Sequence, residues 1–192
     1  MTIPDTRLAG AAVELLTASS PATMVNHCFR TYRFGLALAE RGGLAPDREL
    51  FFLGAALHDL GLTPAYDGPE PFEAIGADAA HEFLLAQGAA ADRADLVAEA
   101  IRLHLLAGTA KDPRPEVALV SMGAAVDVFG LRIDRIDPDV TRRIVEEHPR
   151  LGFKDAVAAL IGDQAARKPD SAIADLIRAG AGDLLAASPF TE

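Results

Sequence analysis

The sequence predicts an all-α protein with a single domain. Apolar residues recur at helical spacing along most of the 192 residues, and Gly or Pro residues separate these segments. No segment alternates apolar and polar residues with a period of two, and no Asn-Gly or Asp-Gly pair lies between alternating segments, as it would in a β-hairpin. A chain of this length can bury one continuous core. We therefore expect one compact helical bundle over residues 1–192, without internal repeats or a linker.

The composition narrows the classes of partner. Half of the residues are hydrophobic and the formal net charge is -10, which argues against binding of nucleic acid or anionic lipid over a broad surface. The sequence contains no apolar segment long enough for a membrane span, and its first residues lack the pattern of a secretion signal. Cys28 is the only cysteine, which suits a reducing compartment. We expect a cytoplasmic protein that acts on a small-molecule substrate, and its very apolar helices would tolerate a homodimer.

Residues 5–18 and 22–41 are predicted to form the first two helices, and the second of these ends at a pair of glycines. His27 shares the apolar face of the second helix, so its imidazole is expected to point inward. Arg30 lies one turn further along and can reach the same region. Cys28 points about 100° away from His27 around the helix, and we expect a buried, unreactive thiol there.

The central segment, residues 50–62, is apolar on every side of a helix and ends in the pair His58-Asp59. A helix without a polar face is a core helix. Burying an imidazole and a carboxylate at its end is costly unless the two groups are paired or coordinate a metal ion. The loop that follows, residues 63–71, is rich in Pro and Gly and carries Tyr66 and Asp67. Such a loop beside a buried polar pair is a candidate entrance for a substrate.

Helical spacing predicts three further helices, over residues 72–87, 92–106 and 115–130. Asp92 is expected to cap the second of these, and His104 lies on its apolar face. Pro115 suits the first turn of the third helix, on which Asp127 is a carboxylate among apolar residues. Gly123 lies one turn before Asp127 and would allow another element to approach closely.

Additional helices are expected near the C-terminus. Three short segments that contain proline are predicted to begin them, namely Asp137-Pro138, His148-Pro149 and Pro169-Asp170-Ser171.

Polar groups on three separate helices are thus predicted to face inward: His27, His58 with Asp59, and Asp127. Two imidazoles and two carboxylates suit a mid-row divalent ion and leave positions open for water. An ion of this kind makes hydroxide available at neutral pH. The residues alone leave a second interpretation open, in which each histidine is a hydrogen-bonded core residue and Asp127 belongs to a buried polar network.

Several short motifs support the first interpretation by their order along the chain. They are Asn26-His27 with Arg30, residues 57–63 (LHDLGLT), Phe72-Glu73, residues 76–80 (GADAA), Glu99-Ala100-Ile101 with Leu103-His104, residues 125–128 (AVDV) and Phe153-Lys154. This pattern resembles the HD superfamily of metal-dependent phosphohydrolases and related enzymes, and more closely its cyanamide hydratase-like family. The resemblance implies a helical HD-domain core over approximately residues 21–155, with C-terminal helices in residues 156–188 packing on it.

The resemblance also implies the metal site. His27, His58, Asp59 and Asp127 would hold one divalent ion, most simply zinc, with iron, manganese or nickel as alternatives. Family members with two metals place a histidine where this chain has Phe72. A mononuclear site is therefore expected.

The same resemblance indicates the reaction. It implies a hydratase or hydrolase in which metal-bound hydroxide adds to a small electrophile such as cyanamide or a related nitrile. Relatives that cleave phosphate esters often carry a lysine at the position of Leu62, and a neutral pocket does little for an anionic phosphate. The alternative is a phosphohydrolase acting on a nucleotide or another small phosphomonoester, in which Arg30 and Lys154 bind the phosphate. A third hypothesis is a non-enzymatic binding module in which the site only stabilises the fold or senses a ligand.

The remaining candidates receive individual roles. Asp59 could act as the base on the attacking water, and His104 is expected near the metal as a substrate contact or proton shuttle. Asn26, Arg30 and Lys154 are candidates for orienting the substrate. Glu73 could be a general base at the mouth of the pocket, but we expect a solvated carboxylate in a first turn. We expect the two other histidines, His81 and His148, to lie at the surface or at helix ends.

Overall fold

The computed structural model describes residues 3–192 and contains ten α-helices and no strand within that range, which confirms the predicted fold class. The helices are α1 (Arg7–Ser19), α2 (Ala22–Gly42), α3 (Arg48–Leu57), α4 (Phe72–Ala86), α5 (Ala91–Leu103), α6 (Pro115–Phe129), α7 (Pro138–Glu147), α8 (Phe153–Arg167), α9 (Ala172–Arg178) and α10 (Ala181–Ala186). Three short 3₁₀ turns, η1 (Leu60–Leu62), η2 (Thr109–Lys111) and η3 (Ile133–Arg135), connect some of them. None of the helices in the described residues is both long and apolar enough to cross a bilayer.

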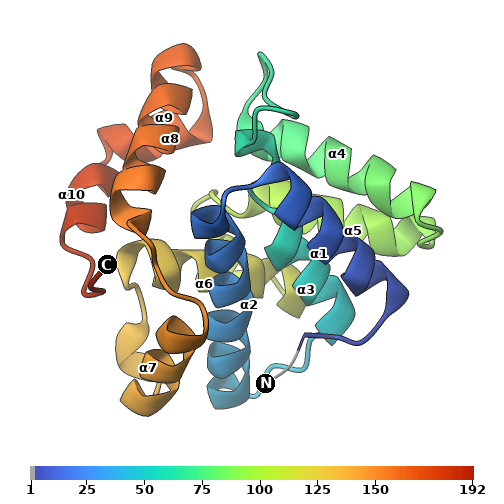
Figure 1. Cartoon of the computed structure of the whole chain (residues 1–192), viewed down its shortest axis with the longest axis horizontal. Coiled ribbons are helices and arrows are strands. Elements are labelled where there is room, and N and C mark those ends of the chain that lie inside the picture. Colours follow the sequence, from blue (N-terminus) through green and yellow to red (C-terminus); the bar gives the residue numbers. More distant parts are fainter. Residues whose placement is uncertain (1–2) are drawn as a thin grey trace.

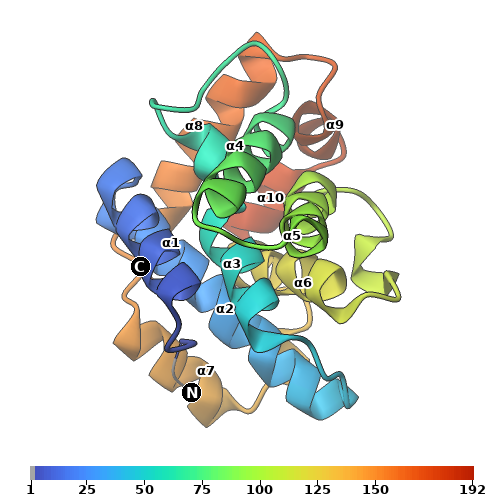
Figure 2. The same ribbon diagram turned by 90° about the vertical axis from the view of Figure 1, so that its right-hand side faces the viewer.

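Helix α2 lies at the centre of the molecule (Figure 1). Helices α1, α3, α4 and α5 lie on one side of it, and α8 to α10 lie on the other. Helix α6 packs against α2, α3 and α5, so it joins the two sides. Figure 2 shows α5 and α6 next to each other, with α4 beside α5. Three buried apolar clusters result within the described residues. One lies under α1, α3 and α5, a second lies between α8, α9 and the end of the central segment, and a third joins α2, α6 and α7 to Phe190.

The contact between α2 and α6 depends on a glycine. A Cβ atom at Gly123 would lie 2.1 Å from the backbone carbonyl oxygen of Thr31 on α2. No side chain larger than hydrogen fits there without separating the two helices. The close approach predicted at Gly123 is confirmed, and it brings Asp127, one turn further along α6, next to α2.

The central segment is a helix only as far as Leu57. His58 is the C-cap residue, Asp59 follows it in a non-helical conformation, and η1 completes the turn. A Cβ atom at Gly61 would lie 2.0 Å from the carbonyl oxygen of Phe72, the first residue of α4. The glycine therefore lets the start of α4 press against the turn that carries the His-Asp pair.

The helix starts test several local predictions. Pro115 occupies the first turn of α6, and the side chains of Asp137 and Ser171 accept backbone hydrogen bonds as caps of α7 and α9, as predicted. The predicted cap at Asp92 is wrong, because Ala90 is the N-cap of α5 and Asp92 lies inside its first turn.

The predicted helix start at His148-Pro149 is also wrong. Helix α8 begins only at Phe153, because Leu151 and Gly152 adopt positive φ angles of 56° and 75°, which interrupt a helix. The carbonyl oxygens of His148 and Pro149 instead accept hydrogen bonds from side chains of α2.

The C-terminal helices are held to the rest of the molecule from two directions. Helix α8 packs on α2 and α10 packs on α6. Asp67, in the loop that follows η1, bonds to the end of α8: Gln164 Nε2 lies 3.1 Å and Lys168 Nζ 3.3 Å from its Oδ1, and Arg167 Nη2 lies 2.8 Å from its Oδ2. The loop predicted as a substrate entrance is therefore fixed to α8.

Cys28 is 2% exposed, and burial raises the pKa of its thiol well above the ordinary value. A protonated, buried thiol is unreactive. This agrees with the sequence prediction.

The packing at Gly123 gives a first testable prediction. We expect Gly123→Ala to lower the free energy of unfolding by at least about 1–3 kcal/mol, because the added methyl group forces α2 and α6 apart. Gly162→Ala is the matched control on α8, where a Cβ atom meets nothing within 4 Å. The control should be neutral or slightly stabilising, since alanine is the better helix former. Urea unfolding measures both, and equal stability of the two variants would contradict the close contact.

Candidate metal centre

Three of the predicted ligands come together at the end of α3. His27 Nε2 lies 3.2 Å from His58 Nε2 and 3.3 Å from Asp59 Oδ2, and His58 Nε2 lies 3.3 Å from Asp59 Oδ2. Donors about 2.1 Å from one ion would be separated by about 3.0 to 3.4 Å in octahedral or tetrahedral coordination. The three atoms therefore have the spacing and the chemistry of a site for a divalent ion.

Both imidazoles are held in the tautomer that such a site needs. His58 donates its Nδ1 proton to the carbonyl oxygen of Ala55 at 2.9 Å, and His27 donates its Nδ1 proton to Asp127 Oδ2 at 2.7 Å. The Nε2 lone pair of each ring is left facing the other donors. A carboxylate or carbonyl behind a ligating histidine is the usual way in which proteins orient the ring.

Asp127 thus contacts Nδ1 of His27, whereas Nε2 of the same ring faces His58 and Asp59. Its carboxylate is fully buried and is bound by two guanidinium groups as well. Arg30 Nε lies 2.7 Å from Oδ1 and Arg30 Nη2 lies 2.9 Å from Oδ2, while Arg150 Nη1 lies 2.9 Å from Oδ1. In this structure Asp127 orients His27 and pairs two buried cations. Its assignment as a fourth direct ligand stays a prediction.

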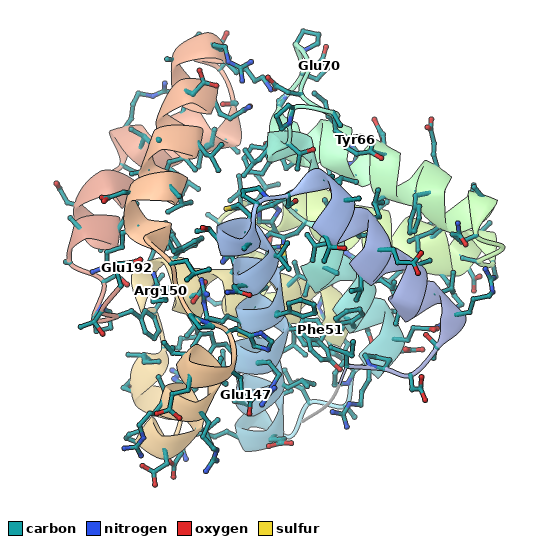
Figure 3. The ribbon with its side chains drawn as sticks, viewed as in Figure 1. Phe51, Tyr66, Glu70, Glu147, Arg150 and Glu192 are labelled. Carbon is teal, nitrogen blue, oxygen red and sulfur yellow. The ribbon has the colours of Figure 1, made fainter. Side chains whose placement is uncertain are left out.

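Arg150 is the residue that sequence reasoning missed. Figure 3 shows it beside Glu192, whose Oε1 lies 3.0 Å from Arg150 Nε. The guanidinium groups of Arg30 and Arg150 lie over the ring of Phe153, 5.1 Å and 4.9 Å from its centroid. Arg150 lies in an irregular segment between α7 and α8, so no periodicity could have shown that it points inward.

The Phe153 ring is also stacked on His27, with 4.7 Å between the centroids. This aromatic residue belongs to one of the motifs that carry the family resemblance. Its position explains that motif physically, since it covers the histidine and the two guanidinium groups together.

The protonation states favour cation binding. Burial lowers the pKa of His58 to about 4, so this ring is neutral at pH 7. Burial by itself would raise the pKa of Asp59, but the neighbouring His58 and His27 hold it well below the usual range. Burial opposes ionisation of Asp127 in the same way, and His27 and Arg30 still lower its pKa to about 2. Neutral imidazole and ionised carboxylate are the forms that bind a metal ion.

His27 carries the opposite shift. Burial lowers its pKa, but the hydrogen bonds to Asp127 and Asp59 outweigh burial, so the pKa lies above the ordinary value. A divalent cation at the three donor atoms would take the place of the proton that these carboxylates attract.

His104 lies beside the three donors, at the C-cap of α5. It donates its Nδ1 proton to the carbonyl oxygen of Ile101 at 2.6 Å, and its ring meets the edge of His58 with 5.1 Å between centroids. It lines the same pocket as the donors. Burial lowers its pKa, so the ring is neutral at pH 7 with an unprotonated Nε2. This position agrees with a substrate contact or proton shuttle.

The other three candidates lie outside the pocket lining. Asn26 Nδ2 donates to the carbonyl oxygen of Pro149 at 2.7 Å, and Arg30 Nη1 donates to the same oxygen at 3.1 Å. Lys154 Nζ donates to the carbonyl oxygen of Ser188 at 2.8 Å. Their side chains hold the chain around Arg150 and the C-terminal segment in place, so their positions indicate structural rather than substrate-binding roles.

The remaining polar residues divide into two groups. His81 is partly exposed and bonds to Asp95 on α5 at 2.9 Å, and His148 ends α7 and stacks on Phe29, as expected for surface and helix-end residues. The prediction of a solvated Glu73 is wrong. This side chain is only 6% exposed because the start of α4 presses against the turn at Gly61, and its Oε2 has no hydrogen-bond partner within residues 3–192.

A pocket of about 190 Å³ opens beside the donor group. His27, His58, Asp59 and His104 form its polar side, and the rest of the lining is almost entirely apolar. Helix α6 contributes one wall, and α8 and α9 contribute the opposite wall. Leu62 and Phe72, whose apolar side chains led to the expectations of a neutral substrate and a single metal ion, both lie in this lining.

An all-α bundle in which two histidines and an aspartate meet beside a pocket has the donor set of a metal-dependent enzyme. The sequence matches the HD domain family over residues 24–140, which is more than half of the chain and includes the three donors and Asp127. The chain belongs to the HD domain family. A comparison with curated proteins found no relative that matches it.

Substitution of Asp127 tests whether this residue orients His27 and pairs the two arginines or is itself a metal ligand. We expect Asp127→Asn to lower the metal affinity by about 10- to 100-fold through misorientation of His27. It should also lower the unfolding free energy of the metal-free protein by about 3–5 kcal/mol, because two buried guanidinium groups lose their anion.

Asp59→Asn is the matched control, since Asp59 has no arginine partner among its short contacts in the described chain. It should empty the site and leave the stability of the metal-free protein nearly unchanged. Elemental analysis and urea unfolding in chelator provide the two readouts. Complete metal loss from Asp127→Asn, as from Asp59→Asn, would instead make Asp127 a direct ligand, and an unchanged stability would contradict its pairing with Arg30 and Arg150.

Proposed function

We propose that this protein is a metal-dependent hydratase or hydrolase that adds water to a small neutral electrophile, such as cyanamide or a related nitrile. The observation that carries the proposal is the donor group of His27, His58 and Asp59 in a pocket whose lining, over residues 3–192, contains no lysine or arginine. The proposal includes one ion per chain, most simply zinc, with iron, manganese or nickel as alternatives.

A divalent ion held by His27, His58 and Asp59 would make hydroxide available at neutral pH. Asp59 places Oδ2 in the donor group, so its second carboxylate oxygen can accept the proton that the water gives up. His104 offers an unprotonated Nε2 on the pocket side, because its Nδ1 proton is committed to Ile101. It can therefore take this same proton from Asp59 and pass it to the nitrogen of the substrate, so that the one proton lost by the water is the one that the nitrogen gains.

The charges around the pocket support a neutral substrate. A phosphate dianion would meet Leu62 and Phe72 and would leave water without a compensating cation from the protein. Arg30 and Lys154, the cations expected to bind phosphate, are engaged with Asp127 and Ser188. A nitrile carries no charge and avoids this desolvation cost.

A phosphohydrolase acting on a nucleotide or another small phosphomonoester is the second candidate. Membership of the HD domain family is equally consistent with this activity. In that case the metal ion itself would have to supply the positive charge for the phosphate, because the pocket lining within the described chain does not.

The two candidates can be ranked by substrate. We expect protein purified without chelator to hold about one equivalent of divalent metal and to hydrate cyanamide or another small nitrile. Phosphatase kcat/KM should be at least about tenfold lower, a difference of about 1.4 kcal/mol in transition-state binding. Urea formation and phosphate release over a panel of nitriles, nucleotides and sugar phosphates measure this. Efficient phosphate release with no nitrile hydration would reverse the ranking.

His104 gives a test of the proton path. We expect His104→Ala to keep the metal and lower kcat by about 10² to 10⁴, the usual contribution of a general acid or base. His81→Ala is the control, since that histidine bonds to Asp95 away from the pocket. Elemental analysis and steady-state kinetics are the measurements. Metal loss in His104→Ala would show that His104 is a metal ligand. An unchanged kcat would show that it is a buried packing residue without a part in proton transfer.

A further inference from the structure

The pocket is larger than a cyanamide molecule requires. Its volume is about 190 Å³, and an apolar protein cavity of about 150 Å³ is large enough to hold benzene. Cyanamide has only three non-hydrogen atoms, so it would leave most of this space empty. An apolar space that the substrate leaves empty contributes nothing to binding.

The pocket lining other than the histidines, Asp59 and Ser121 is apolar, and most of it is aliphatic. Val157 and Ile161 of α8 and Ile173 and Leu176 of α9 form one wall, and Val128 lies on the opposite wall from α6. Ser121 is the only polar lining residue outside the histidine and aspartate group in the described chain. A surface of this kind binds a hydrocarbon group and rejects a charged or strongly hydrated one.

The two sides of the pocket come from different parts of the chain. The donors lie within residues 24–140, which match the HD domain family, whereas α8 and α9 begin after that range. The position of α8 is fixed at its far end by the contacts of Gln164, Arg167 and Lys168 with Asp67. The apolar wall is therefore a rigid addition of this chain to the metal-binding part.

We propose that the pocket binds a neutral substrate with a hydrocarbon body of about six to ten non-hydrogen atoms, alkyl or aryl, whose reactive group lies at His27, His58 and Asp59. Helices α8 and α9 select this body. The position of the reactive group rests on the proposed function, whereas the binding of the hydrocarbon body rests only on the pocket.

A series of nitriles tests the inference by binding, independently of turnover. Acetonitrile, butyronitrile, hexanenitrile, octanenitrile and benzonitrile are titrated calorimetrically into the metal-loaded protein. We expect the dissociation constant to fall by about threefold to fourfold for each added methylene group until the pocket is filled. Hexyl phosphate should bind at least tenfold more weakly than hexanenitrile. Dissociation constants that do not change along the series, or tighter binding of hexyl phosphate, would overturn the proposal.

Variants localise the effect. Ala125 lines the pocket and is partly exposed, so Ala125→Phe fills space without entering the core. This variant should weaken the binding of hexanenitrile at least tenfold and leave the dissociation constant of acetonitrile unchanged. Ala158→Phe, on the exposed face of α8 and outside the lining, is the matched control and should behave as the parent protein. Ile161→Ala removes side-chain volume from the wall that α8 forms, so it enlarges the pocket and should shift the tightest binding to a longer nitrile. Equal effects of Ala125→Phe and Ala158→Phe would overturn the assignment.

The outcomes also separate this inference from the proposed reaction. Chain-length-dependent binding without hydration of any nitrile would support the hydrocarbon pocket and refute the hydratase. Hydration of cyanamide with no dependence of binding on chain length would support the hydratase and refute the hydrocarbon pocket.

Discussion

The buried carboxylate of Asp127 is the group on which the arrangement of the site depends. It accepts hydrogen bonds from His27, Arg30 and Arg150, and none of these four side chains is more than 2% exposed. Each member would be costly to bury alone, because an unpaired charge in a low-dielectric interior is strongly destabilising. The negative charge of Asp127 compensates the positive charges of the two arginines, and its hydrogen bond to Nδ1 fixes the ring of His27 with Nε2 toward the other donors. The stability of the core and the geometry of the metal site are therefore properties of one network.

This network also links the C-terminal segment to the site. Arg150 bonds to Glu192, and Lys154 bonds to the carbonyl oxygen of Ser188, so the C-terminal segment closes over the same region. On the other side of the pocket, Asp67 joins the loop after η1 to the end of α8. The C-terminal helices are thus held at both ends, and a rigid apolar wall faces the donors. A wall that is fixed in this way can discriminate between substrates by size, because it does not relax around a smaller one.

The sequence determined the class of fold and indicated three candidate ligands that come together in the structure. Helical periodicity with no alternating segment predicted an all-α protein, and an entirely apolar helix ending in His58-Asp59 predicted a buried polar site. These two predictions were confirmed because they depend on local spacing and on the cost of burying polar groups, and both can be inferred from the order of the residues alone. Gly123 was readable for the same reason, since a glycine on an apolar helix face signals a close neighbour.

The tertiary structure decided which atoms meet. Sequence spacing placed Arg30 and Asp127 on inward faces, but it could not show that the guanidinium group pairs with the carboxylate and is thereby directed away from the pocket. Arg150 and the buried Glu73 were unreadable, because the first lies in an irregular segment and the burial of the second depends on how α4 packs on Gly61. The apolar wall is decided in the same way, since α8 and α9 reach the donors only through long-range packing. Contacts between residues far apart in the chain carry no periodic signal, so only the folded molecule shows them.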